Sequence, residues 1–159
     1  MNPTRVLIAV GAAVVLAAVN LSILGKEAIK RDGVVVYLDL QPVDPRSIMQ
    51  GDYMTLRFRL AQEIEGRDRN LVREGEVRLA DVLVDEQRVG RLAQPGAAPT
   101  LRIRYRVRKG RVWLGTNAFF FEEGSESRYA PARYGEFRVD TASGEAVLVG
   151  LRDANLKAL

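Results

Sequence analysis

The stretch LRIRYRVR, residues 101–108, decides the fold class of this chain of 159 residues. Its apolar residues alternate with arginines, and a period of two places the two sets on opposite faces of a β-strand that is buried on one side. Lys109 and Gly110 follow as turn residues, and Val112 to Leu114 supply a second apolar run. The stretch therefore predicts an antiparallel hairpin.

Similar patterns recur on both sides of this hairpin. Short apolar or alternating runs, separated by turn residues, occupy 34–40, 52–60, 77–84, 88–92, 118–121, 137–139 and 146–151. The turn residues at 85–87 and 141–144 predict two further hairpins, 77–92 and 137–151. The charged segment 63–75 predicts an irregular crossing or a short helix, and QPGAAP at 94–99 predicts a loop. Strands at this spacing predict a mainly β soluble domain at 34–159, built as a small antiparallel β-sandwich or a partly open barrel.

Residues 6–24 read VLIAVGAAVVLAAVNLSIL and contain no charged side chain. A helix of this length reaches about 28 Å, close to the hydrocarbon thickness of a bilayer. The sequence therefore predicts a short tail at 1–5, a transmembrane helix at 6–25 and a juxtamembrane helix or linker at 26–33 that Gly33 ends. Two alternatives are a signal peptide cleaved near Ala17 and Ala18, and a fully buried core helix.

Two rules place the soluble domain on opposite sides of the membrane. Lys26, Lys30 and Arg31 follow the apolar run whereas Arg5 precedes it, and this excess of basic residues favours the cytoplasmic side. A short tail, one span and a long C-terminal domain form the usual layout of a bacterial signal anchor, and long domains translocate largely regardless of charge. We favour a single-pass protein of the bacterial inner membrane with a periplasmic domain.

The chain contains neither cysteine nor histidine. Within one chain this excludes disulfides, thiol nucleophiles, a Ser-His-Asp triad and the usual ligand sets of zinc enzymes. The net charge of +4 is smaller than is typical of a nucleic-acid-binding domain, although it is compatible with binding to an anionic lipid or polymer. These features favour a non-enzymatic protein without a cofactor, a metal or a nucleic-acid partner.

The segment PVDPRSIMQGDYMTLRF, residues 42–58, carries a specific motif. Its residues Gly51, Asp52, Tyr53, Leu56 and Phe58 resemble the signature G-D-Y-x-x-L-x-Y, which names a family of bacterial membrane-associated proteins. The preceding Asp44, Pro45, Arg46 and Ser47 resemble the family's lead-in, and 132–140 with 146–153 resemble its C-terminal signature. The departure is Phe58 in place of tyrosine, which removes a phenol but keeps an aromatic ring for packing.

The resemblance gives no activity to carry over to this chain. Family members tend to accompany multi-span membrane proteins, so the resemblance implies a partner of that kind. The residues themselves allow a further argument: Pro45 restricts the backbone, Gly51 permits conformations closed to other residues, and Asp52 can accept hydrogen bonds from turn amides. Two interpretations stay open. The motif is either a turn into a central strand or a loop that presents Arg46, Asp52 and Tyr53 to a partner.

A basic face is predicted on the strand 101–108, formed by Arg102, Arg104, Arg106 and Arg108. Arg57 and Arg59 extend this row if the two strands are neighbours. The row is either a solvated outer face or a surface for lipid headgroups, an anionic glycan or an acidic partner. No aromatic residue is interleaved with the arginines on their face of the strand, which argues against binding of single-stranded nucleic acid.

Enzymatic alternatives are weaker. The segment from Ser47 to Asp52 faintly resembles part of the type I signal peptidases, which are membrane-anchored β-domain enzymes with a Ser/Lys dyad. Such a dyad needs a desolvated lysine, whereas Lys109 is predicted at a hairpin tip. A carboxylate pair for glycoside hydrolysis, or a site for a hard cation, is conceivable among Asp52, Glu122, Glu123, Glu126 and Asp140. The spacing of these residues does not single out a particular pair or ligand set. We predict an accessory or interaction domain, with a membrane-bound Ser/Lys peptidase as the alternative.

Overall fold

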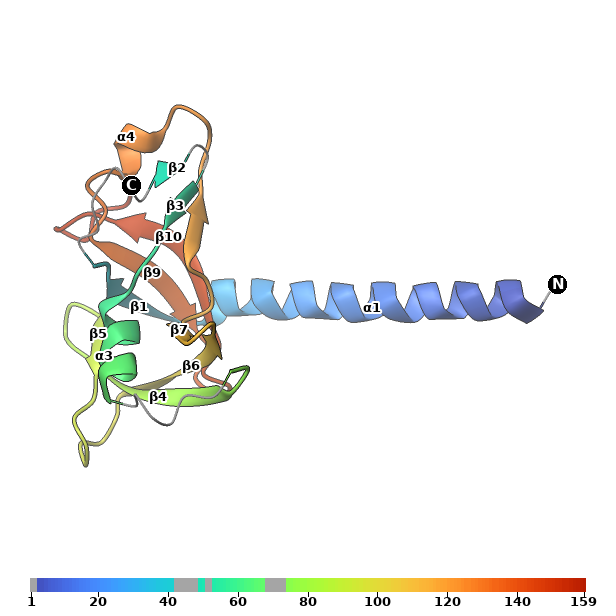
Figure 1. The fold of residues 1–159 in the computed structure, drawn as a ribbon, viewed down its shortest axis with the longest axis horizontal. Helices are drawn as coiled ribbons and strands as arrows, with labels where there is room; N and C mark the ends of the chain where they lie inside the picture. The colour runs from blue at the N-terminus through green and yellow to red at the C-terminus, as the bar shows by residue number, and fades with distance from the viewer. Residues whose placement is uncertain (1–2, 42–48, 51–52, 68–73) are drawn as a thin grey trace.

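A computed structural model describes residues 3–41, 49–50, 53–67 and 74–159 of the chain. The helix α1 (Pro3–Asp32) projects away from a β-rich domain (Figure 1). It is long and apolar enough to cross a membrane, and none of its apolar window is buried, which does not fit a core helix. The helix ends at Asp32, and the following Gly33 donates its amide to the Ile29 carbonyl at 2.9 Å.

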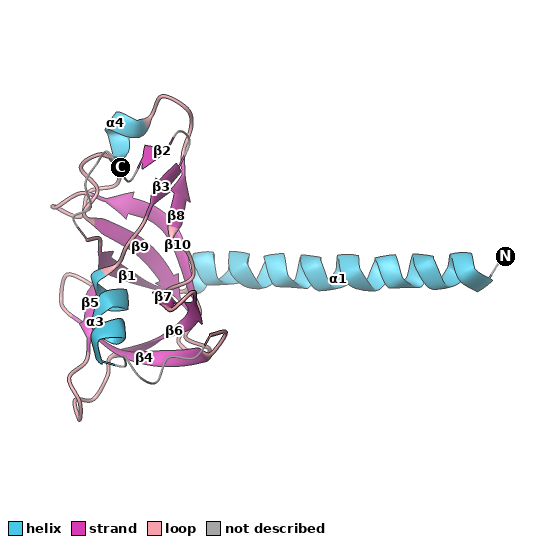
Figure 2. Cartoon of the chain, in the orientation of Figure 1, coloured by secondary structure: helices cyan, strands magenta, loops and turns pink. Residues whose placement is uncertain are grey.

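Seven strands form the main sheet, in the order β10-β9-β1-β5-β4-β6-β7 (Figure 2). Their bounds are β1 Val34–Asp39, β4 Val77–Val84, β5 Val89–Leu92, β6 Leu101–Arg108, β7 Arg111–Trp113, β9 Tyr134–Val139 and β10 Ala146–Arg152. The hairpins β4–β5, β6–β7 and β9–β10 are those predicted from the sequence. The pairing of β1 with β5 is parallel. Parallel pairing needs a long connection between the two strands, and the segment through β2, β3, α3 and β4 supplies it.

The main sheet curls until its two ends approach each other. The turn between β9 and β10 reaches β6, next to the edge strand β7, where the Arg104 amide donates to the Gly144 carbonyl at 2.6 Å. Close approach is possible because Gly144 lacks a side chain, since an added Cβ would lie 2.6 Å from Leu79 Cδ2. The predicted partly open barrel is therefore confirmed, as a half-barrel.

A second sheet of three strands lies in the order β2-β3-β8, formed by Met49–Gln50, Tyr53–Thr55 and Ala118–Phe120. The predicted strand 52–60 is too long at its end. Phe58 forms only an isolated bridge with Leu40, and α3 (Arg59–Arg67) begins immediately afterwards. A helix forms here instead of a longer strand because Leu60 and Ile64, four residues apart, share one helical face and are both buried. A short helix, α4 (Glu126–Tyr129), follows β8.

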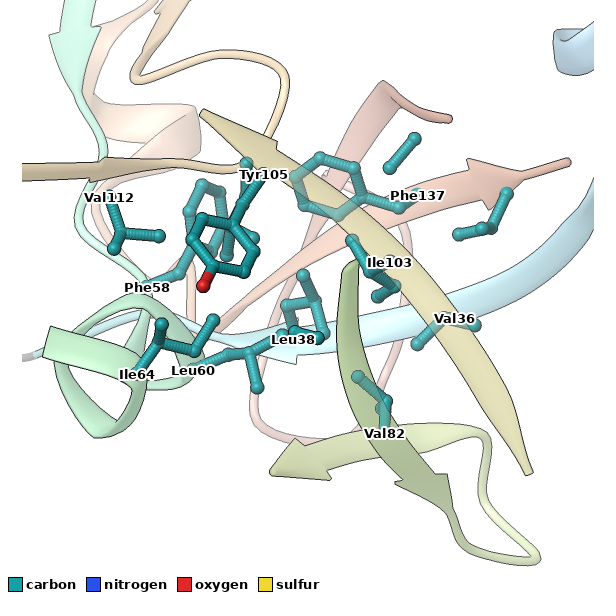
Figure 3. Close-up of a cluster of buried hydrophobic side chains, with 14 of the residues drawn as sticks. Val36, Leu38, Phe58, Leu60, Ile64, Val82, Ile103, Tyr105, Val112 and Phe137 are labelled. Carbon is teal, nitrogen blue, oxygen red and sulfur yellow. The ribbon is translucent and has the colours of Figure 1, made fainter. Parts of the chain in front are cut away.

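The core fills the inside of the curled sheet, with α3 covering one end (Figure 3). Val36 and Leu38 of β1 and Phe137 of β9 are fully buried at its centre. On β6 the burial alternates along the whole strand, with the apolar residues inside and the four arginines exposed. The predicted amphipathic strand is thereby confirmed, and it sets the arginines on the outer surface of the domain.

Candidate functional site

The family-like motif is only partly within the described residues. Six of its nine predicted positions lie outside these residues, namely Asp44, Pro45, Arg46, Ser47, Gly51 and Asp52. The other three, Tyr53, Leu56 and Phe58, are described and have different surroundings. The predicted binding loop thus remains a prediction, and the strand that follows it can be analysed.

Phe58 and Leu56 are core residues. Phe58 is 3% exposed, and its ring meets that of Phe137 edge-on with 5.1 Å between the centroids. A Cβ added at Gly135 would lie 2.8 Å from Phe58 Cε1, so the glycine makes room for the ring. Leu56 is buried as well, and its amide donates to the Asn117 carbonyl at 2.7 Å. These two motif positions stabilise the fold.

Tyr53 instead faces an exposed aromatic residue. It begins β3, where it is half-buried and pairs in register with Phe120 of β8. The two ring centroids lie 5.8 Å apart, and Phe120 is 73% exposed at an edge strand of the small sheet. We call this pair of rings the motif edge. Phe120 is not among the predicted site residues, although alternation along an extended run of three phenylalanines points the middle ring away from its two neighbours.

The two residues that flank Phe120 in the sequence point to the opposite face of the small sheet. Phe119 and Phe121 are half-buried, and each packs against the ring of Tyr129 in α4 at centroid distances of 5.1 and 5.3 Å. Alternation along the strand therefore divides the three rings between the protein interior and the surface. The motif edge is exposed because the interior side of β8 is already filled.

The predicted basic face exists on β6, and an aromatic residue joins it. Arg106 pairs across the sheet with Trp113 of β7, and the Arg108 guanidinium carbon lies 5.2 Å from the Trp113 ring centroid. The expectation that no aromatic lies among these arginines is therefore wrong. A neighbouring strand supplies the ring, so the spacing within β6 could not reveal it.

Arg57 and Arg59 do not extend the row. The neighbours of β3 are β2 and β8, whereas those of β6 are β4 and β7, so the condition for a continuous row is not met. Arg59 lies instead beside Asp39 of β1, with 3.7 Å between Nη1 and Oδ2. Arg57 is exposed just after β3.

An ion cluster joins α1 to the basic face. Glu145, just before β10, forms salt bridges with Lys26 of α1 and with Arg104 of β6, the latter at 2.8 Å. At the same junction the Arg138 guanidinium donates to the Gly33 carbonyl at 3.3 Å. These contacts place the basic face beside the point where α1 leaves the domain.

The catalytic alternatives gain no geometric support. Lys109 is exposed in the β6–β7 turn, with a φ of 51°, and Ser47 lies outside the described residues. Asp140 serves a turn: the Ser143 hydroxyl and the amides of Ala142 and Ser143 donate to its carboxylate and lower its pKa. Across the described part of the chain, no group of three acidic side chains is placed to hold a metal ion.

The fold and the junction define a half-barrel domain carried by one N-terminal helix that fits a single-pass membrane anchor. The model for the GDYXXLXY protein family matches residues 15–151, so this chain belongs to that family. Comparisons with curated proteins and with solved structures give no match.

Proposed function

We propose that this protein is a membrane-anchored accessory protein whose periplasmic domain binds a multi-span membrane protein and catalyses no reaction. The observation that carries the proposal is the motif edge, where Phe120 stands exposed beside the motif residue Tyr53. A large exposed aromatic ring on an edge strand offers both apolar area and unpaired backbone groups to another protein.

The anchor supports a partner within the same bilayer. Because α1 can cross a membrane, it confines the domain to the membrane surface, where the proteins it meets most often are themselves embedded. Confinement raises the effective concentration of the domain near such a partner, so a small contact surface is sufficient. The family resemblance to proteins that accompany multi-span membrane proteins points to the same class of partner.

Photocross-linking from the motif edge tests the partner. A photoreactive phenylalanine analogue at position 120, in the full chain in its native membrane, should give one adduct with a membrane protein of several spans, identified by mass spectrometry. The same analogue at Ala97, exposed in the loop before β6, is the control and should give no such adduct. No adduct from position 120, or the same adduct from both positions, would contradict the proposal.

The side of the membrane is tested separately. The layout of a short tail, one apolar helix and a long domain supports the periplasm, despite the basic residues that follow the helix. A C-terminal alkaline phosphatase fusion should be active, because this enzyme matures only outside the cytoplasm. An inactive phosphatase fusion with a fluorescent C-terminal fusion protein would place the domain in the cytoplasm.

The peptidase alternative makes a different prediction. A Ser/Lys dyad would lose its function on either Ser47→Ala or Lys109→Ala substitution. We expect cells that carry each variant to behave as the wild type, because Lys109 is exposed in a turn and is not desolvated there. Loss of function in both variants, at unchanged protein level, would favour the peptidase over the accessory protein.

A further inference from the structure

We propose that the outer face of β6 and β7 beside α1 binds the anionic headgroups of the bilayer that α1 crosses. This lipid-facing patch consists of Lys26, Val77, Arg104, Arg106, Arg108 and Trp113, which together line one groove of about 250 Å³. The proposal concerns how the domain lies on the membrane, and it does not depend on the protein partner proposed above.

The patch is built by cross-strand pairing. Arg106 lies between Val77 of β4 and Trp113 of β7 in register, so an apolar side chain, a cation and an aromatic ring form one row across the sheet. Val77 is 46% exposed and Trp113 is half-buried. A row of this composition matches the bilayer interface, where aromatic rings sit at headgroup level and basic side chains reach phosphates.

The charge of the patch is strongly unbalanced. Among the described residues that line the groove, Lys26, Arg104, Arg106 and Arg108 are cations and Glu145 is the one carboxylate. Within the described residues Arg106 and Arg108 form no salt bridge, whereas Arg104 shares Glu145 with Lys26. Two guanidinium groups thus remain to bind phosphate, which they can do with two parallel hydrogen bonds each.

The anchor places this charge at the level of the headgroups. Lys26 follows Leu24, the last apolar residue of the predicted span, by two positions, so it lies about 3 Å further along the helix axis. Through Glu145 it is joined to Arg104, so this arginine of the patch shares that level. This continuity with the anchor favours the lipid of the same bilayer over an acidic protein or a glycan.

The single tryptophan of the chain is the probe for this contact, because Trp113 lies within the patch. The full chain is placed in nanodiscs of phosphatidylcholine alone or with phosphatidylglycerol, each with a small fraction of lipid that carries a nitroxide on its headgroup. We expect the nitroxide to quench Trp113 fluorescence at least twofold more in the phosphatidylglycerol discs. High salt should remove most of this difference, because the attraction is between exposed charges.

Charge reversal supplies the decisive comparison. Arg106→Glu with Arg108→Glu should abolish the extra quenching. The matched control, Arg91→Glu with Arg133→Glu, changes the charge equally and should keep it, because both arginines are exposed and β5, which carries Arg91, lies on the side of the domain away from α1 (Figure 1). If circular dichroism shows that the reversed variant is unfolded, Arg106→Gln with Arg108→Gln takes its place.

Three results would overturn the proposal. These are equal quenching in the two kinds of disc, extra quenching that survives the loss of both arginines, or extra quenching that the control variant loses as well. In the first case, Trp113 that stays unquenched in all discs would leave the patch to an acidic protein or glycan.

Discussion

Phe58 and Phe120 show how one residue type serves two purposes around the same motif. Phe58 is buried against Phe137 and Gly135, whereas Phe120 is exposed beside Tyr53. The family signature has tyrosine at the position of Phe58. Because this position is inside the core, packing explains an aromatic residue there, and the proposed contact with a partner involves only the motif edge.

This difference predicts unequal effects of truncation. Phe58→Ala should lower the free energy of unfolding by about 3–5 kcal/mol, as expected when a buried aromatic ring leaves a cavity. Phe120→Ala should lower it by less than about 1 kcal/mol, because its ring is mostly in solvent. Urea unfolding of the two variants measures both values. Equal losses would show that Phe120 belongs to the core.

Asp140 predicts a dependence of stability on pH. Its pKa lies below the ordinary value of 3.8, because hydrogen bonds from the Ser143 hydroxyl and from two turn amides favour its carboxylate form. A depressed pKa contributes stability above the ordinary value, and this contribution is lost as the pH falls through the pKa of the folded state. Asp140→Asn should therefore lower the melting temperature near pH 7 and reduce its decline in acid.

The control for Asp140 is another exposed acid. Glu123 lies in the loop after β8, and Glu123→Gln should leave both the melting temperature and its pH dependence unchanged. Thermal unfolding followed by circular dichroism between pH 7 and pH 3 compares the two variants. A steeper acid decline in Asp140→Asn than in the wild type would contradict the assigned sign.

At the scale of elements, the ion pair between Glu136 and Arg152 links β9 to β10. The Glu136 side chain is 10% exposed, and its Oε2 accepts from the Arg152 guanidinium at 2.7 Å from Nε and 2.5 Å from Nη2. The two strands also pair in register, with a shift between Leu148 and Gly150. The last hairpin, which reaches β6 and partly closes the barrel, is thus held by charge as well as by backbone bonds.

A double substitution tests this pair. Arg152→Met alone should cost about 3–5 kcal/mol of unfolding free energy, because it leaves a buried carboxylate without its counter-charge. Adding Glu136→Gln should recover part of that loss, since the remaining side chain is neutral. Urea denaturation of both variants and of Glu136→Gln alone completes the cycle. Strictly additive costs would mean that the two groups do not stabilise each other.

At the scale of the whole molecule, the domain and its anchor are separate in their packing. The apolar window of α1 contributes nothing to the core, and the salt bridge from Lys26 is partly exposed. An exposed pair of this kind contributes about 0–1 kcal/mol. We therefore expect the domain to fold without the membrane segment.

Removal of α1 should leave a folded domain. A chain that begins at Gly33 should be soluble without detergent and should melt within about 5 °C of the full chain, given the small contribution of the lost contacts. Circular dichroism and calorimetry make this comparison, with the full chain in detergent as the reference. Aggregation, or a melting temperature far below the reference, would show that α1 completes the fold.

The sequence by itself determined the features that depend on local order. A continuous apolar run specifies a helix that can cross a membrane, since each residue adds a known rise. The alternation in residues 101–108 specified which side of β6 is buried, because successive side chains in a strand point in opposite directions. Turn residues between apolar runs located three hairpins, and the motif at 51–58 indicated the family.

The tertiary structure alone decided what distant segments build together. The parallel pairing of β1 with β5, the approach of Gly144 to β6 and the cluster of Lys26, Arg104 and Glu145 each join parts of the chain that no local period connects. Trp113 lies among the arginines because β7 pairs with β6. The predicted strand 52–60 ends early because burial of Leu60 and Ile64 favours the helix α3 from Arg59 onward. Such contacts arise from the curl of the sheet and from shared burial, which depend on all the strands at once.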